Sequence, residues 1–266
     1  MKRSHLPPTG TLLAVALLCL AAGGAAAQAV QPTPAPATGV LHYEVVEAKT
    51  RKPLYSVRGW NQAAAGDITH VVAASDLVFP GGNRVEIRVT FTREEPPRCV
   101  SWTTRVKDSD GTVVASGHQQ FVPAAFPFLS RPVPPNAYPP LAPLGYLLTR
   151  LGLGTKQEAS FDFILMGTSL LQMDLWVDGR EEVRVPAGTF ACHRVRMRVN
   201  PHSLFPNLPG FLQPFVRFFI PVHTLWLTAD APQTLIKYTG QMGPPGSPQL
   251  LIELVGVDHG AGRLAP

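Results

Sequence analysis

Two alternating segments joined by a Pro/Gly corner, between Glu181 and Val199, constrain the fold of this chain more than any other feature. In the second segment, Val195 and Met197 alternate with arginines, so one face is apolar and the other basic. A period of two is that of a β-strand with one buried face. The proline fixes φ and ends the first strand, and the glycine permits a backbone conformation that other residues avoid. The pattern predicts an antiparallel hairpin whose corner is covered by Phe190.

The same alternation recurs along the chain between short turn sequences. Asp110-Gly111 and Asp178-Gly179 each stand between two such runs, where Asp-Gly is a strong hairpin signal. Besides the return strand to Val199, the predicted strands are Val40–Ala48, Leu54–Trp60, Thr69–Phe79, Arg84–Thr92, Arg98–Lys107, Thr112–Phe121, Leu171–Val177, Glu181–Val185, Val222–Thr228, Thr234–Thr239 and Gln249–Val257. About a dozen short strands predict an all-β, mainly antiparallel fold, a curved sheet or half-barrel with short helical or loop insertions covering an opening.

The N-terminus has the organisation of a secretory signal peptide. A short basic start precedes the apolar run Leu12–Ala22, which is short for a bilayer span, and small residues that fit cleavage after Ala27 or Ala29 follow it. An uncleaved membrane anchor is the alternative. We expect residues 1–29 to be removed, and the mature protein to be periplasmic without a transmembrane span.

The rest of the chain is expected to form one β domain, residues 39–258, between a Pro/Ala spacer (30–38) and a tail (259–266). Two apolar insertions, 121–154 and 201–221, interrupt the strands. The first offers a short helix, and the phenylalanines of the second recur at helical spacing. Segments this apolar pack on something. They either plug the ends of a barrel or form a lid or mouth over an apolar cavity.

Candidate ligand-binding residues come from these insertions and from the basic strand. Aromatic side chains that would line an apolar mouth are Phe126, Phe128, Tyr138, Tyr146, Phe211, Phe215, Phe218 and Phe219. Arg194, Arg196 and Arg198 would contact an anionic headgroup if they faced inward. If they faced water they would only keep the sheet soluble and discourage edge pairing. The solvated arrangement is favoured, because unpaired buried arginines are costly.

Two cysteines, Cys99 and Cys192, remain after removal of the signal peptide. In an oxidising compartment a pair of cysteines can form a disulfide. Strand parity places each of them with polar neighbours, which permits pairing across adjacent strands. Two unrelated free thiols are the equal alternative, since a disulfide needs a proximity that the sequence does not show.

The sequence lacks the familiar patterns of catalysis and metal binding. It contains no G-x-S-x-G, H-E-x-x-H or C-x-x-C motif and no P-loop, and no two histidines stand at the spacing of a local ligand pair. Basic residues do not cluster with aromatic ones, as they would in a nucleic-acid-binding protein. We expect a non-enzymatic protein with no cofactor, no metal and no nucleic-acid partner.

The hairpin also carries a family resemblance. V-P-A-G-T-F at Val185–Phe190, an alternating strand, then Leu225-Trp226-Leu227 and T-L-I-K-Y at Thr234–Tyr238, resembles an uncharacterised family of exported bacterial proteins with a domain of unknown function. The resemblance covers about Phe161 to Val257 best. It implies a curved antiparallel sheet wrapped like the lipoprotein carriers LolA and LolB, and it brings no catalytic residues. The two apolar insertions are longer than that family suggests.

These observations lead to one main hypothesis and one alternative. Charged residues make up only 15% of the chain, which indicates that apolar groups are exposed to a ligand or a membrane. The main hypothesis is a periplasmic protein that binds or shields an apolar ligand such as a lipid. The alternative is a structural or assembly module that docks on an envelope protein through the same insertions.

Overall fold

The computed structural model describes residues 39–258, apart from residue 65, most of 123–143, 152, 154–156, 166–168, 206, 231 and 242–246. The expected signal peptide, spacer and tail lie outside the described residues, as does Phe128.

One sheet of thirteen strands holds all the described strands, in the order β6-β5-β4-β3-β2-β1-β13-β12-β11-β10-β9-β8-β7. Neighbouring strands are antiparallel except for the short β7–β8 pair. The strands are β1 (Val40–Glu47), β2 (Pro53–Ala64), β3 (Asp67–Val78), β4 (Arg84–Thr92), β5 (Cys99–Lys107), β6 (Val113–Gln120), β7 (Ala137–Tyr138), β8 (Glu158–Leu165), β9 (Ser169–Val185), β10 (Gly188–Val199), β11 (His223–Thr228), β12 (Leu235–Gln241) and β13 (Gln249–Asp258). The helices are α2 (Leu144–Arg150), α3 (Pro201–Leu204), the 3-10 turn η2 (Gly210–Leu212) and α4 (Gln213–Arg217). The predicted all-β, mainly antiparallel curved sheet is confirmed.

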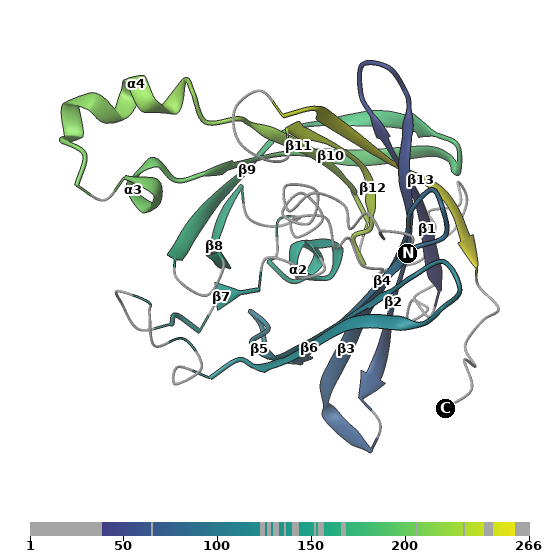
Figure 1. The fold of residues 1–266 in the computed structure, drawn as a ribbon. Helices are drawn as coiled ribbons and strands as arrows, with labels where there is room; N and C mark the ends of the chain where they lie inside the picture. The colour runs from purple at the N-terminus through teal and green to yellow at the C-terminus, as the bar shows by residue number, and fades with distance from the viewer. Residues whose placement is uncertain are drawn as a thin grey trace, which may run out of the picture.

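The sheet curves around α2, and its two end strands approach the same side of the molecule (Figure 1). Pairing of β1 with β13 joins the two ends of the domain in the middle of the sheet. The hydroxyl of Tyr138 on β7 donates to the carbonyl of Pro97, 2.7 Å away, just before β5. This bond connects the two ends of the open sheet through a side chain rather than through a strand ladder.

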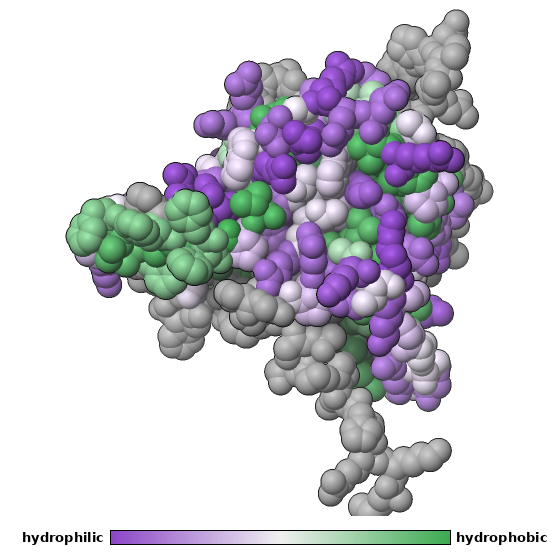
Figure 2. Space-filling model, turned by 90° about the horizontal axis from the view of Figure 1, so that it is seen from above, coloured by the Kyte–Doolittle hydropathy of each residue, from purple (hydrophilic) through white to green (hydrophobic). Residues whose placement is uncertain are grey.

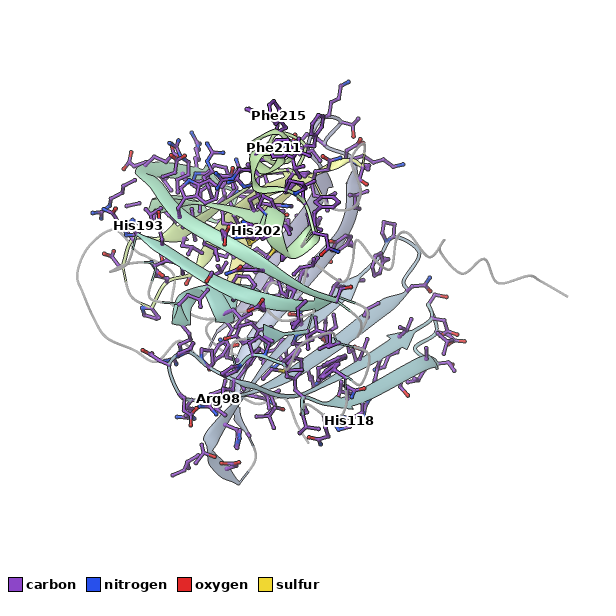
Figure 3. All side chains as sticks on the ribbon, turned by 90° about the vertical axis from the view of Figure 1, so that its left-hand side faces the viewer. Arg98, His118, His193, His202, Phe211 and Phe215 are labelled. Atoms are coloured by element: carbon purple, nitrogen blue, oxygen red, sulfur yellow. The ribbon has the colours of Figure 1, made fainter. Side chains whose placement is uncertain are left out.

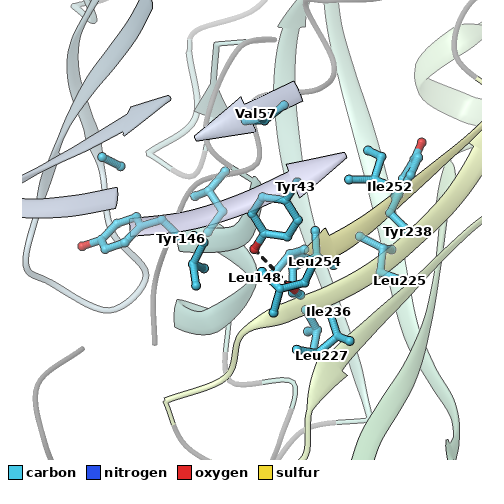
Figure 4. Packing of buried hydrophobic residues seen from close by; sticks show 14 of the residues in the cluster. Tyr43, Val57, Tyr146, Leu148, Leu225, Leu227, Ile236, Tyr238, Ile252 and Leu254 are labelled. Carbon is cyan, nitrogen blue, oxygen red and sulfur yellow. Dashed lines mark hydrogen bonds between the residues drawn. The ribbon is translucent and has the colours of Figure 1, made fainter. Parts of the chain in front are cut away.

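The core fills the concave side of the sheet. Alternate strand residues point inward and meet Tyr146, Leu147 and Leu148 of α2, all buried. Figure 4 shows this packing, in which the buried Tyr43 hydroxyl donates to the carbonyl of Leu235 at 3.0 Å. Burial raises the pKa of Tyr43, so the hydroxyl stays protonated and remains a donor. The apolar face of the strands is therefore the concave face, and α2 is packed within it.

The Pro/Gly corner forms as the sequence predicts. Val185 pairs with Gly188 across the turn, and Gly188 has a φ of +140° that residues with a Cβ adopt only under strain. The Phe190 side chain lies against the corner, 4% exposed. The predicted hairpin between β9 and β10 is confirmed.

The hairpin predicted at Asp178-Gly179 is wrong, because β9 continues through these two residues. In the β9–β10 ladder Arg194 pairs with Gly179 and Val195 with Val177, which leaves Asp178 without a partner. This is a β-bulge, and Gly179 does not have the positive φ that an Asp-Gly hairpin turn needs. Asp-Gly signals a kink in the strand here rather than its end.

The face predicted for both cysteines is also wrong. Cys99 and Cys192 are buried free thiols on the concave side, on β5 and β10, with seven strands between them in the sheet order. A register shift sets Cys99 opposite the buried Phe91. In β10 the buried positions are even-numbered up to Cys192 and odd-numbered from Val195 onward, because a bulge lies between them. The alternation of buried and exposed positions therefore cannot be extended across a bulge.

Candidate functional site

The second apolar insertion forms an arm that projects from the sheet between β10 and β11. We call residues 201–221 the aromatic arm; its described part contains α3, η2 and α4. Figure 1 shows α3 and α4 extending away from the curved sheet, and Figure 3 shows Phe211 and Phe215 on the arm. The expectation that this insertion plugs the barrel or covers its mouth is wrong.

The base of the arm is fixed to the sheet by Asn200. Its side-chain oxygen accepts from the backbone amide of His202 at 2.9 Å and so caps α3, while Pro201 at the first helical position needs no partner for an amide. The Asn200 side-chain amide donates to the carboxylate of Asp174 on β9, also at 2.9 Å. The arm therefore leaves the sheet in a defined direction rather than as a free loop.

Five phenylalanines on the arm are exposed; Phe205 is 48% exposed, and the other four are more so. Phe211, Phe215, Phe218 and Phe219 are 74%, 65%, 86% and 77% exposed, respectively. Figure 2 shows the arm as a hydrophobic projection beside a largely hydrophilic surface of the sheet. Isolated exposed apolar residues are ordinary, but a cluster of four large ones marks a site of interaction.

Charge on the arm is of one sign only. Between Pro201 and Pro221 the sequence contains no Asp or Glu, and Arg217 is the only Lys or Arg. Arg217 follows Phe215 and precedes Phe218, so the cation belongs to the segment that carries the aromatic side chains. An apolar surface with a cationic group and no carboxylate suits a partner that is apolar or anionic.

A polar cleft of about 630 Å³ lies where α4 faces the outer surface of β8, β9 and β10. We call it the arginine cleft. It is lined by Glu158, Ala159, Ser160, Asp174, Leu175, Trp176, Arg198 and Arg217. Its volume is within the range of small-molecule sites.

The cleft floor is set by the register of three adjacent strands. Asp174 on β9 pairs with Ser160 on one side and Arg198 on the other, and Trp176 pairs with Glu158. The Arg198 guanidinium lies over the Trp176 ring, 5.4 Å from its centroid. Such stacking holds a guanidinium in place while leaving its N–H groups at the ring edge able to donate.

The pKa of Arg198 is lowered by its surroundings in the cleft. Partial burial lowers its pKa, the nearby positive charge of Arg217 lowers it further, and Asp174 opposes both. Its Nε is buried and has no hydrogen-bond partner among the described residues. Two guanidinium groups therefore face one cleft, and the charge of Arg217 disfavours the charged form of Arg198.

The other two arginines of the basic strand are neutralised on the outer surface. Asp178 at the bulge accepts from the Nε of Arg194 at 3.1 Å and from that of Arg196 at 2.8 Å. These donors lower the pKa of the Asp178 carboxyl. The three arginines predicted as one group thus divide into an ion-paired pair and Arg198, which lines the cleft.

The aromatic residues predicted for a single mouth also separate. Phe126, Tyr138 and Tyr146 of the first insertion are at most 5% exposed and belong to the core. The described residues of this insertion pack into the core, whereas the phenylalanines of the arm are exposed. The two groups do not line one opening.

Sequence reasoning missed Glu158, Asp174, Trp176 and Arg217 as site residues. Asp174 and Trp176 alternate with buried Met173 and Leu175, so the sequence signals their outward direction. It does not signal which strands lie beside them or that α4 faces them.

Within the described ranges, the structure shows neither a metal-ligand cluster nor a membrane-spanning helix. There, no group of three His, Cys, Asp or Glu side chains comes together as a metal site would require. None of the helices that the structure describes is long and apolar enough to cross a bilayer.

Comparison with known proteins gives distant structural likenesses only. No family model matches the chain, and no curated protein is significantly similar to it. A protein described as exported, with a YmcC-like fold, from Bacteroides fragilis is 11% identical, with a TM-score of 0.34, and the match covers 83% of this chain and 95% of that one. A protein described as a lipoprotein from Parabacteroides distasonis is 12% identical over 83% and 95% of the two chains, with a TM-score of 0.31. The lipoprotein LppX of Mycobacterium tuberculosis is 12% identical over 81% and 84%, with a TM-score of 0.24. At these levels the likenesses assign neither family nor activity.

Proposed function

We propose that this protein is exported and binds phospholipid through the aromatic arm, without catalysing a reaction. The observation that carries the proposal is the exposure of Phe211, Phe215, Phe218 and Phe219 on one projecting segment. The N-terminal sequence, with its basic start, apolar run and small-residue exit, supports export.

Those phenylalanine side chains gain free energy by leaving water. Burying one phenylalanine is worth ~1.5–3 kcal/mol. Four such side chains therefore supply a driving force of several kcal/mol before the cost of association is subtracted. The concave side of the sheet does not bury these phenylalanines, because α2 already fills it.

Lipid is favoured over a protein partner by the chemistry of the arm. A segment with exposed phenylalanines, one arginine and no carboxylate matches an interfacial lipid-binding segment, with apolar side chains among acyl chains and the cation near headgroup phosphates. A protein surface would more often be met by a mixed, hydrogen-bonding rim.

Vesicle co-sedimentation of the mature chain tests the proposal. Wild-type protein is expected to bind vesicles of phosphatidylethanolamine and phosphatidylcholine, and F215S/F218S to bind about a hundredfold more weakly or worse, because two buried rings are lost. The matched control is I68S/V114S, which removes two apolar side chains that are 85% and 53% exposed elsewhere on the sheet.

Two results would overturn the proposal. Absence of vesicle binding by the wild-type protein is one, and an equal loss in I68S/V114S is the other. Crosslinking from Phe215 to an envelope protein, with no bound lipid, would instead support the assembly-module alternative.

A further inference from the structure

We propose that the arginine cleft is a binding site for the phosphate of a zwitterionic phospholipid headgroup, held between Arg198 and Arg217. This inference rests on the proposed lipid binding and specifies which part of the lipid the protein recognises. It assigns the arm and the outer face of the sheet to one site, the arm for acyl chains and the cleft for the headgroup.

The arginines of β10 differ in their ion pairing. Arg194 and Arg196 each have a carboxylate oxygen of Asp178 within 3.1 Å. Within the described part of the chain, neither Arg198 nor Arg217 forms an ion pair, although both line one cleft. Two neighbouring guanidinium groups that no carboxylate pairs directly repel each other, and an anion bound between them offsets that repulsion.

Arg198 has unused hydrogen-bonding capacity. Its guanidinium is held over the Trp176 ring at 5.4 Å, and its buried Nε has no partner among the described residues. A guanidinium presents its donors in a planar fork that fits two oxygens of a phosphate. Arg217 approaches from α4 on the other side of the cleft and supplies a second cation.

The two carboxylates in the cleft select the kind of phosphate that it binds. Asp174 accepts the side-chain amide of Asn200 and is thereby engaged in holding the arm. Glu158 lies on β8, across the Trp176 row from the arginines. The cleft thus carries two cations and two carboxylates, which disfavours a polyanion and suits a phosphate that is joined to an amine directed toward Glu158.

The cleft lies beside the arm, because Arg217 of α4 lines it. Arg217 lies within the α4 segment, between the exposed Phe215 and Phe218. A headgroup in the cleft would therefore place its acyl chains alongside the exposed rings of the same helix. One short helix then contacts both parts of an amphipathic ligand.

Titration of the full mature chain with soluble headgroup analogues tests the cleft separately from the arm. Glycerophosphoethanolamine and inorganic phosphate are added in parallel, and binding is followed by the NMR signal of the Trp176 indole N–H, assigned with W176F. The wild-type protein is expected to bind glycerophosphoethanolamine more tightly than inorganic phosphate. R198Q/R217Q is expected to weaken that binding about tenfold or more, because charge-assisted hydrogen bonds to the phosphate are lost.

The matched control is R84Q/R105Q, which removes the same charge from two exposed arginines on β4 and β5, away from the cleft. It should leave the affinity unchanged. E158Q should reduce the preference for glycerophosphoethanolamine over inorganic phosphate while preserving the response of the indole signal.

The outcomes separate this inference from the proposed function. Equal binding of inorganic phosphate would identify a free-phosphate site and overturn the headgroup assignment. Loss of binding in R84Q/R105Q equal to that in R198Q/R217Q would also overturn it, as would no response to either analogue. If F215S/F218S abolishes vesicle binding but R198Q/R217Q binds vesicles like the wild type, the arm binds lipid and the cleft assignment fails. If the wild type binds glycerophosphoethanolamine but no vesicles, the cleft assignment stands and lipid binding by the arm fails.

Discussion

His223 and Tyr238 form a buried pair on neighbouring strands, with the imidazole Nδ1 2.6 Å from the phenol oxygen. Burial raises the pKa of Tyr238, so the hydroxyl is the donor and the neutral imidazole is the acceptor. Burial lowers the pKa of His223 to about 4. The pair therefore fits the fold only while His223 is uncharged.

This pair predicts a pH dependence of stability. Between about pH 6.5 and about pH 4 the unfolded chain binds a proton at His223 that the folded chain does not, so acidification favours unfolding. The stabilising contribution of the neutral His223 to the free energy of unfolding is fully present above about pH 6.5. It is lost as the pH falls to about 4, and it amounts to roughly 3 kcal/mol.

Denaturant unfolding across that range measures the effect, with H223N as the comparison because asparagine keeps an acceptor and does not titrate. The difference in unfolding free energy between wild type and H223N should change with pH in this window. A constant difference would contradict the prediction.

Gly240 on β12 predicts a second stability effect from the same pair. A Cβ at Gly240 would overlap the His223 ring nitrogen and the Tyr238 hydroxyl. Because both rings are buried and hydrogen-bonded to each other, moving either one aside is unfavourable. G240A should therefore lower the free energy of unfolding by about 1–3 kcal/mol. G117A on β6 is the control, since a Cβ there meets nothing within 4 Å. Equal unfolding midpoints for the two variants in thermal melts would refute this explanation.

The alternation of apolar residues predicted the antiparallel sheet because each strand buries one face. It worked best for β4, whose predicted bounds, Arg84–Thr92, are those observed. It failed at the bulges, where Asp178 and Cys192 depart from strict parity. A bulge depends on the pairing of two strands, and a single strand's pattern does not contain that information.

The candidate site was predictable only in part, for a similar reason. Phenylalanines at helical spacing predicted a helical, apolar segment, but not whether it would face inward or outward. The two insertions have similar compositions, but their described residues differ in environment: Tyr146 is 3% exposed and Phe218 is 86% exposed. The cleft needs cross-strand register, which joins Trp176 to Glu158, and this long-range contact has no local signature.

The plug formed by α2 predicts a large cost for truncating Leu147. This side chain is fully buried against the concave face, so L147A removes apolar contacts and leaves a cavity. The expected loss of unfolding free energy is about 2–5 kcal/mol. V114A, at a position 53% exposed on β6, should change it by less than about 0.5 kcal/mol. A small effect of L147A in denaturant unfolding would show that α2 is not part of the core.

The two cysteines predict thiol reactivity that depends on unfolding. Burial raises the pKa of Cys99, and burial together with the negative charge of Glu181 raises that of Cys192 to about 12, so neither forms a thiolate at neutral pH in the folded protein. Iodoacetamide added to the native mature chain without reductant should label neither thiol. In denaturant, again without reductant, mass spectrometry should detect two labels. Two labels require free thiols, so an unlabelled chain in denaturant would reveal a Cys99–Cys192 disulfide, and rapid labelling of the native chain would show that the concave side opens to solvent.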